Sequence, residues 1–234
     1  QMVASAPTNT VDREQLAEMI VGRHVERPIS EVSKPGLTLL SLKNISVIEK
    51  TTKRTLLDSI NLELQANQIL GVAGVSGNGQ ASLAEVLSGL VQPQKGEYSI
   101  KNETLRSASP VTLTRQGVAR IPEDRHSQGI VSEMNIWENL LLDELGEKPV
   151  WRMRSLLDRG KARARADELI ASFDIRCKNS EQPAGLLSGG NIQKLILARN
   201  LARSPDIILA NQPTRGLDEG AIAAVHKLLI EARD

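Results

Sequence analysis

A glycine-rich segment in the first half of the chain has the spacing of a phosphate-binding loop. Residues 74–82 read Gly-Val-Ser-Gly-Asn-Gly-Gln-Ala-Ser. The apolar run before them predicts a strand and the leucines after them predict a helix, which is the context that such a loop requires. Backbone N–H groups at the start of a helix attract an anion. We therefore expect phosphate oxygens to contact Gly74, Ser76, Gly77, Asn78, Gly79, Gln80, Ala81 and Ser82.

The same loop departs from the motif G-x-x-x-x-G-K-S/T at the positions that carry its charge and its metal contact. Gln80 stands where a lysine would reach the β- and γ-phosphates, and Ala81 stands where a hydroxyl would bind Mg²⁺. Ser82 follows one residue later, which turns its side chain about 100° around the helix. Taken alone, the segment is also compatible with an ordinary strand-to-helix turn.

Three further segments decide between these alternatives. Residues 187–194 read Leu-Ser-Gly-Gly-Asn-Ile-Gln-Lys and precede an apolar helix that is expected to run to Leu201. Residues 207–218 begin with Ile-Ile-Leu-Ala, a continuous apolar run typical of a buried parallel strand, and end at Asp218. Between the two halves, residues 121–130 read Ile-Pro-Glu-Asp-Arg-His-Ser-Gln-Gly-Ile. Their order and spacing favour a phosphate-binding domain over an isolated turn.

The hydrophobic pattern supplies the elements that must position these segments. Alternating apolar residues predict partner strands over 37–48 and 56–64, and a short apolar run predicts a strand over 69–73. Apolar residues at helical spacing predict helices over 83–90, 162–173 and 221–232. This order of elements predicts an α/β fold with a helical insertion.

The composition is that of a globular protein. The chain has 234 residues, of which 40% are hydrophobic and 24% charged, and its formal net charge is +1. These values exclude disorder and argue against a protein that binds nucleic acid by charge alone. Aromatic residues make up only 2%, so stacking on bases or sugars is not a major mode of recognition. No apolar run approaches the roughly 20 residues that cross a bilayer. The single cysteine, Cys177, excludes an internal disulfide.

Together these motifs resemble those of the ATP-binding cassette (ABC) family. Residues 187–190 resemble its LSGG signature, residues 207–212 its Walker B strand, and Asp218 its D-loop. Residues 121–130 are similar to a Pro-Glu-Asp-Arg stretch in importers for simple sugars and nucleosides, in the second cassette of their tandem ATP-binding subunits. The resemblance implies a P-loop NTPase (RecA-like) ABC nucleotide-binding domain with an antiparallel β subdomain and an inserted helical subdomain.

The resemblance also implies a division into domains. Residues 1–36 are expected to be the helix and linker between two cassettes, since residues 19–23 resemble the junction that closes a first cassette. Residues 37–234 are expected to form the second cassette, with a helical subdomain over about 128–186 and an early end. The family's switch-region histidine would follow Asp234, so His226 on the last helix is not its counterpart.

The acidic Walker B residues of the family have neutral counterparts in this chain. In the family, an aspartate binds Mg²⁺ through water and the following glutamate polarises the attacking water. The matching positions are Asn211 and Gln212, and Glu123 stands at the Q-loop position. The resemblance implies ATP as the ligand, with Mg²⁺ at a composite site formed with a partner cassette and no metal-binding residue in this chain. Efficient hydrolysis at this chain's own loop is not expected.

The signature, in contrast, is complete. The resemblance implies that its residues contact the γ-phosphate held by the opposite cassette of a head-to-tail dimer; they are Leu187, Ser188, Gly189, Gly190 and Gln193. Asp218 would couple the two sites. The expected partners are the first cassette of the same polypeptide, transmembrane permease subunits and, indirectly, a solute-binding protein. The expected location is the cytoplasmic face of the bacterial cell membrane, and no nucleic acid is expected as a partner.

Two alternatives stay open on the sequence alone. One is an ATPase that is active in its own right, in which Gln80 and Ser82 compensate through altered geometry. Hydrolysis by the isolated domain would favour it. The other is a soluble ABC protein of translation or DNA repair, which co-purification with a hydrophobic partner would exclude. The transported solute cannot be predicted from this segment, because the membrane and solute-binding components select it.

Overall fold

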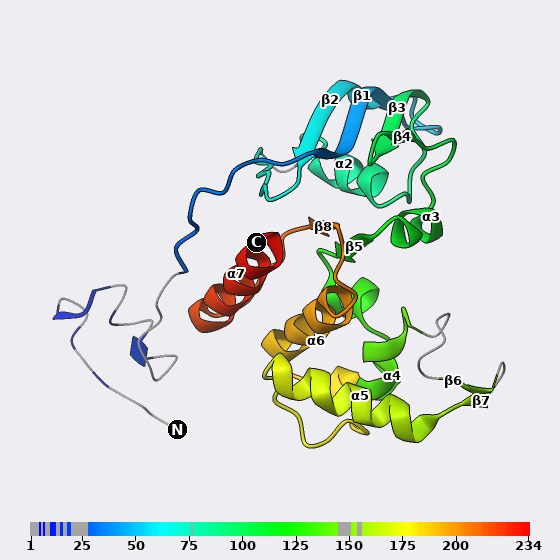
Figure 1. Cartoon of the computed structure of the whole chain (residues 1–234). Helices are drawn as coiled ribbons and strands as arrows, with labels where there is room; N and C mark the ends of the chain where they lie inside the picture. The colour runs from blue at the N-terminus through cyan, green and yellow to red at the C-terminus, as the bar shows by residue number, and fades with distance from the viewer. Residues whose placement is uncertain are drawn as a thin grey trace. The chain divides into compact units, whose positions relative to one another are not determined.

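A computed structural model places the chain in two compact units (Figure 1). The structure describes residues 5, 7, 10–12, 15, 18–19, 28–75, 77–144, 151–153 and 156–234. The sheet unit comprises Val32–Pro122, Asn200–Asn211 and Arg233–Asp234, and the helical unit comprises Gln1–Glu31, Glu123–Arg199 and Gln212–Ala232. Of the expected N-terminal helix and junction, Leu16 and residues 20–23 lie outside the described residues.

The sheet unit is built on a four-stranded antiparallel sheet in the order β2-β1-β3-β4. Its strands are β1 (Thr38–Ile48), β2 (Thr55–Gln65), β3 (Lys95–Ile100) and β4 (Glu103–Thr104). The expected pair of alternating strands is confirmed, because Leu42 of β1 lies opposite Leu62 of β2 and the two strands run antiparallel. Alternation places one set of side chains on the same face of the sheet, where they are buried.

Helices and a parallel strand pair complete the core of the sheet unit. These elements are α2 (Gln80–Leu87), α3 (Pro110–Arg115), β5 (Val118–Ile121) and β8 (Ile207–Ala210). Each contributes to one cluster with the sheet, whose buried members include Leu42, Ile45, Val86, Tyr98, Ile100, Leu113, Val118 and Ile207. Burying one aliphatic side chain fully stabilises a protein by about 1.5–3 kcal/mol. This cluster therefore fixes α2, and with it the loop that precedes α2, against the sheet (Figure 1).

The strand expected over residues 69–73 is wrong. These residues form no strand, and the side chains of Ile69 and Val72 are each 56% exposed. A strand needs a hydrogen-bonded neighbour, and among the described strands β5 and β8 pair only with each other. Gly71 has no side chain to pack, which weakens a strand at its centre. Residues 69–73 therefore have the apolar composition of a buried strand, but no described strand pairs with them.

Among its described residues, the helical unit contains three longer helices, α5 (Arg159–Ser172), α6 (Gly189–Leu201) and α7 (Glu219–Arg233), and several short elements. The short elements are η2 (Arg125–Gly129), α4 (Ile136–Leu141), β6 (Trp151–Met153), β7 (Leu156–Leu157) and η4 (Ala184–Leu186). Helices α5 and α7 confirm the expected helical patterns. Ala162, Ala166 and Leu169 are the buried residues of α5, so its arginines form the solvated face.

Trp137 anchors the start of this helical packing. Its side chain is buried, and its indole N–H donates to Glu181 over 3.3 Å. Asn135 and Glu138 form a capping box that begins α4, which satisfies N–H groups that the helix leaves unpaired. Buried residues of α6, among them Ile192, Leu195 and Ile196, supply further core. The helix that follows the predicted signature is therefore held firmly.

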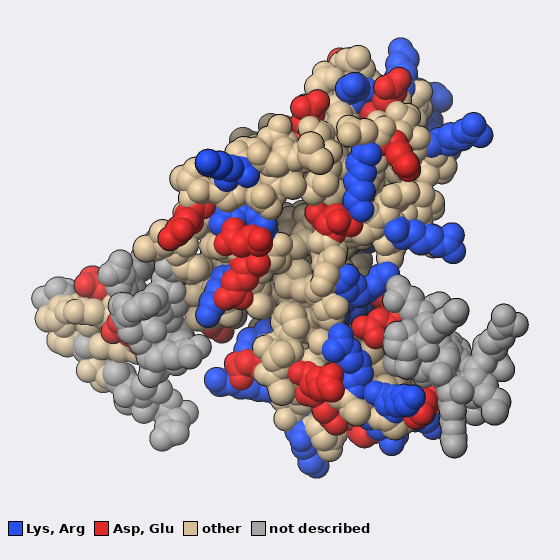
Figure 2. Space-filling view, viewed as in Figure 1, with Lys and Arg blue, Asp and Glu red and all other residues tan. Residues whose placement is uncertain are grey.

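None of the described helices combines the length and the apolar character that crossing a bilayer requires. Basic and acidic side chains are interspersed on the face of the molecule drawn in Figure 2, which agrees with the net charge of +1.

Candidate functional site

The phosphate loop contains two glycines in left-handed backbone conformations. Gly77 has φ 88° and Gly79 has φ 99°, angles that residues with a side chain rarely adopt. Gly79 directly precedes α2, so the loop opens at a helix N-terminus, where the first N–H groups have no partner inside the helix. Ser76, which was expected to take part, lies outside the described residues. The described backbone of the loop can donate to an anion.

Gln80 folds back over this loop. Its side-chain amide donates to the carbonyl oxygen of Val75 over 3.1 Å. A Cβ atom at Gly74 would collide with the same amide nitrogen, so glycine at this position permits the close approach. The amide has a second hydrogen that can donate to a phosphate oxygen. Such a bond is weaker than the charge-assisted bond that a lysine would make.

The loop offers backbone N–H groups and the Gln80 amide to a phosphate group. Ala81 is exposed and has no side-chain oxygen, and Ser82 lies one residue further along the first turn of α2. In the part of the chain that the structure describes, no group of three or more His, Cys, Asp or Glu side chains could hold a metal ion. The loop can therefore hold the phosphates of a nucleotide through its backbone and Gln80, without a carboxylate for the metal.

The Walker B positions lie at the end of β8. Strands β5 and β8 are parallel, with Ile121 opposite Ala210, and the N–H of Asn211 donates to the carbonyl of Ile121 over 3.0 Å. The carboxyl ends of parallel strands meet at the same edge of a sheet, which is where ligands bind in such folds. Gln212 follows in an uncommon left-handed conformation with φ 45°. Both positions offer neutral amides, and no described hydrogen bond joins Asn211 to the phosphate loop.

Glu123, at the Q-loop position, forms an ion pair with Arg215. The two residues are far apart in sequence, and the contact joins the segment after β5 to the turn after β8. The guanidinium Nη1 of Arg215 donates to Oε1 of Glu123, so the ion pair is also a hydrogen bond between these two segments. The structure thus brings together two motifs that the sequence presents separately.

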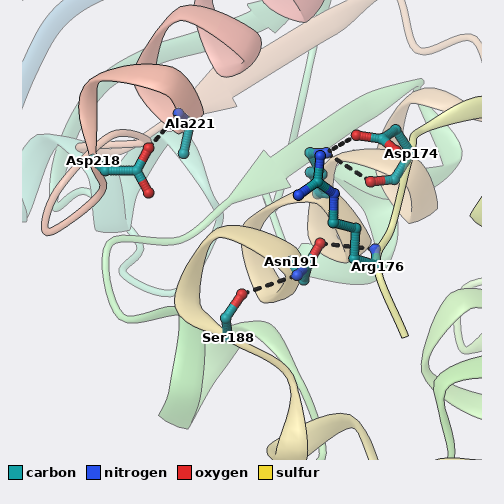
Figure 3. A network of polar contacts seen from close by, with 7 residues as sticks. Asp174, Arg176, Ser188, Asn191, Asp218 and Ala221 are labelled. Carbon is teal, nitrogen blue, oxygen red and sulfur yellow. Dashed lines mark hydrogen bonds and ion pairs between the residues drawn. The ribbon is translucent and has the colours of Figure 1, made fainter. Parts of the chain in front are cut away.

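The predicted signature begins α6, and Ser188 is exposed there (Figure 3). Its hydroxyl oxygen accepts from the side-chain amide of Asn191 over 2.9 Å, and Asn191 accepts from the N–H of Arg176 over 2.9 Å. One turn later, Lys194 donates to both the carbonyl and the carboxylate of Asp174 over 2.6 Å. These contacts fix the start of α6 to residues 174–176. A hydroxyl that accepts a bond keeps its hydrogen, so Ser188 can still donate to a ligand.

The other predicted signature and D-loop residues differ in their surroundings. Leu187 and Gln193 are buried, with 7% and 2% of their surfaces exposed, so their side chains pack inside the helical unit. Gly189 and Gly190 form the first turn of α6 beside the exposed Ser188. Asp218 accepts the N–H of Ala221 over 2.9 Å, which makes it the cap of α7 (Figure 3). Ser188 with its two glycines is therefore the part of the motif that can reach a ligand.

Two residues of this region had no role in the sequence analysis. Asn191 stands three residues after Ser188 at the start of a helix, a spacing at which side chains meet, so the pair was detectable in principle. Arg125 donates to the carbonyls of Arg215 and Gly216, ninety positions further along. No local pattern predicts that contact.

Comparisons with known proteins show the family to which the chain belongs. The family model described as "ABC transporter" matches residues 57–215, and the chain belongs to the ABC transporter family. The guanosine import ATP-binding protein NupO of Bacillus subtilis is 38% identical over 95% of this chain and 44% of its own length. The glucose import ATP-binding protein TsgD13 of Haloferax volcanii is 39% identical over 99% of this chain and 42% of its own length. The chain thus spans less than half the length of these relatives.

Solved structures show the same fold. The dimeric, post-hydrolysis structure of the ATP-binding cassette MJ0796, bound to ADP and Pi, superposes with a TM-score of 0.70 at 24% identity, with 84% of this chain and 83% of that chain covered. A nucleotide-free ATP-binding cassette from an ABC transporter gives a TM-score of 0.69 at 22% identity, with 84% of this chain and 78% of that chain covered. The expected P-loop NTPase fold, with its antiparallel sheet, is therefore confirmed.

Proposed function

We propose that the chain is the second nucleotide-binding domain of an ABC importer for simple sugars or nucleosides, at the cytoplasmic face of the cell membrane. The names of its relatives support import of such solutes, since NupO is a guanosine importer subunit and TsgD13 a glucose importer subunit. Each relative is more than twice as long as the matched segment, which leaves room for another cassette. The partners are that first cassette, the permease subunits and, indirectly, a solute-binding protein.

Within the proposed domain organisation, residues 37–234 form the cassette and residues 1–36 lead into it from the first cassette. The segment over about 128–186 is the helical subdomain. This division is supported by the sheet, which begins at Thr38, and by helices α4 and α5, which lie within residues 128–186.

The two halves of the site have different roles in this proposal. The phosphate loop binds ATP weakly, because Gln80 and Ala81 supply neither a cation nor a metal ligand. The signature serves the partner cassette, where the Ser188 hydroxyl and the glycine N–H groups donate to the γ-phosphate of a bound Mg²⁺–ATP. The observation that carries the proposal is this contrast between a neutral loop and an exposed, firmly anchored Ser188.

Calorimetry on the isolated chain tests the weak site. One charge-assisted contact is worth about 1.5–3 kcal/mol, so the loss of the lysine and of the metal contacts should weaken ATP binding at least about a hundredfold relative to an intact cassette. The affinity should change little when Mg²⁺ is chelated. Tight binding that disappears with a chelator would show that this loop holds a complete site, and the proposal would fail.

A further inference from the structure

The side chain of Arg125 lies between Gly189, at the start of α6, and the turn that precedes Asp218. Its Nη1 donates to the carbonyl of Arg215 over 2.6 Å, and its Nη2 donates to the carbonyl of Gly216 over 3.2 Å. A guanidinium is a planar fork of donors, so it can hold two consecutive carbonyls in a fixed relation where a lysine could not. The bonds attach the segment after β5 to the turn after β8.

Two glycines lie beside this side chain, and Gly189 leaves the space that it occupies. A Cβ atom at Gly189 would lie 2.8 Å from Nη2 and 3.3 Å from both Cζ and Nε of Arg125. Gly216 has φ 64°, and a Cβ atom there would lie 3.5 Å from Nη2. The guanidinium therefore passes directly over the first residue of α6, and any side chain at Gly189 would displace it.

The segment that carries Arg125 is itself fixed at both ends. Asp124 accepts the N–H groups of His126 and Ser127, over 3.0 and 3.1 Å, and begins η2. At the other end, Gly129 packs against Ile196 of α6 so closely that a Cβ atom would collide with it. The carbonyl of Gly129 also accepts from Arg199 over 2.9 Å. Residues 124–129 thus lie along α6 as one rigid piece.

The ion pair between Glu123 and Arg215 is a second tie between the same two segments. Arg125 also buries its Nε, which has no hydrogen-bond partner among the described residues. Leaving a buried donor unpaired opposes folding, and the two charge-assisted bonds of the guanidinium offset that cost. The side chain thus fixes the positions of three segments relative to one another: residues 123–129, residues 215–216 and the start of α6. The unpaired Nε is the energetic cost of this arrangement.

We propose that Arg125 is a positioning residue that locks the start of the signature helix to the turn before Asp218, so that a displacement of residues 123–129 moves both together. The inference rests on the proposed function, in which Ser188 and Asp218 act on the partner's ATP. The described contacts of the Arg125 guanidinium are with protein groups of the helical unit. It acts through the backbone of residues 215–216 and through Gly189.

Hydrogen exchange on the nucleotide-free, full-length protein tests the lock. The amides of Arg215 and Leu217 are protected by bonds inside the turn, to the carbonyls of Gln212 and Thr214. Arg125→Ala should accelerate exchange at these amides about tenfold to a hundredfold, because two charge-assisted bonds are lost. Arg125→Lys should give an intermediate rate. Arg165→Ala, which removes an exposed ion pair with Glu168 on α5, is the matched control and should leave both amides unchanged.

A second variant tests the close passage over Gly189. Gly189→Ala should accelerate exchange in the turn when Arg125 is present, because the new Cβ pushes the guanidinium away. In the Arg125→Ala background the same change should add little, because the clash is gone. Equal effects of Gly189→Ala in both backgrounds would overturn the proposed contact.

ATP hydrolysis by the full-length protein with its membrane partner completes the test. Arg125→Ala should lower kcat at least about tenfold and leave KM for ATP nearly unchanged, since a positioning residue acts through the segments that it holds. Faster exchange throughout α5 as well as the turn would mean a merely structural role and would overturn the inference, as would local loosening with unchanged kcat. If Ser188→Arg has no effect on hydrolysis while the exchange results hold, the proposed function fails and the lock alone survives.

Discussion

Gln80 is the residue whose chemistry most limits the phosphate loop. Gln80→Lys should place an ammonium group where the amide now donates to Val75. We expect ATP to bind about tenfold to a hundredfold more tightly, because a charged donor adds about 1.5–3 kcal/mol to its contact. Turnover should not rise, since Asn211 and Gln212 still supply neither a metal ligand nor a general base. Calorimetry and phosphate release on the isolated domain measure the two quantities separately.

Gln80→Met, which keeps the length of the side chain without a donor, is the control for this change. It should bind ATP no better than the unaltered chain. A large gain in turnover from Gln80→Lys alone would show that the missing acids do not limit hydrolysis at this loop.

Cys177 gives a second test at the same scale. Burial, together with the nearby negative charge of Asp167, raises the pKa of the Cys177 thiol. The thiolate is the reactive form, so a raised pKa lowers its fraction at neutral pH. Alkylation of Cys177 at pH 7 should therefore be slower than that of a cysteine peptide and should speed up as the pH rises. Mass spectrometry of the labelled peptide measures the rate, and equal rates at pH 7 in the folded protein and in urea would contradict the assignment.

Among the elements, α7 depends on Asp218 for its start. Asp218→Ala should lower the free energy of unfolding by about 1 kcal/mol, because the N–H of Ala221 loses its acceptor. Asp218→Asn should keep most of that stability, since asparagine caps helices equally well. Urea denaturation of the three proteins measures the difference.

The same pair of variants also separates the cap from the proposed coupling. If the negative charge of Asp218 acts on the partner site, Asp218→Asn should reduce hydrolysis by the full-length protein although its stability is retained. Stability equal to that of the unaltered protein in Asp218→Ala would contradict the cap itself.

Much of the element order follows from local pattern. Alternation predicts β1 and β2, helical spacing predicts α5 and α7, and a continuous apolar run predicts β8. The failure at residues 69–73 has a tertiary cause, because an apolar run forms a strand only where a neighbour accepts its hydrogen bonds. A local pattern does not contain that information.

The site divides in the same way. The phosphate loop with Gly77 and Gly79, and the helix after it, can be predicted from the sequence, because positive φ and a helix start have local signatures. The contact of Arg125 with residues 215 and 216, and the ion pair of Glu123 with Arg215, join segments about ninety positions apart. They depend on how β5 and β8 pair, so spacing within either segment cannot predict them.

At the scale of the whole molecule, the proposed function divides ATP binding between two unequal sites. In the proposed arrangement, Gln80 and Ala81 leave this chain's own phosphate loop without a cation or a metal ligand, while Ser188 serves the site of the other cassette. The variants Ser188→Arg and Gln80→Ala should therefore have very different ATPase rates in a complex of the full-length protein with its membrane partner. Ser188→Arg adds bulk at an exposed position, so the fold should survive it. Gln80→Ala alters a loop that already lacks a lysine and a metal ligand.

The most direct measurement is the ATPase rate of that complex, with the unaltered protein beside Ser188→Arg and Gln80→Ala. Unchanged thermal unfolding of each variant controls for loss of the fold. We expect Ser188→Arg to lower the rate by at least about a hundredfold, since a contact made to the transition state is lost. Gln80→Ala should lower it by less than about tenfold. If Gln80→Ala is the more damaging of the two, hydrolysis takes place at this chain's own loop, and the division of roles proposed here is wrong.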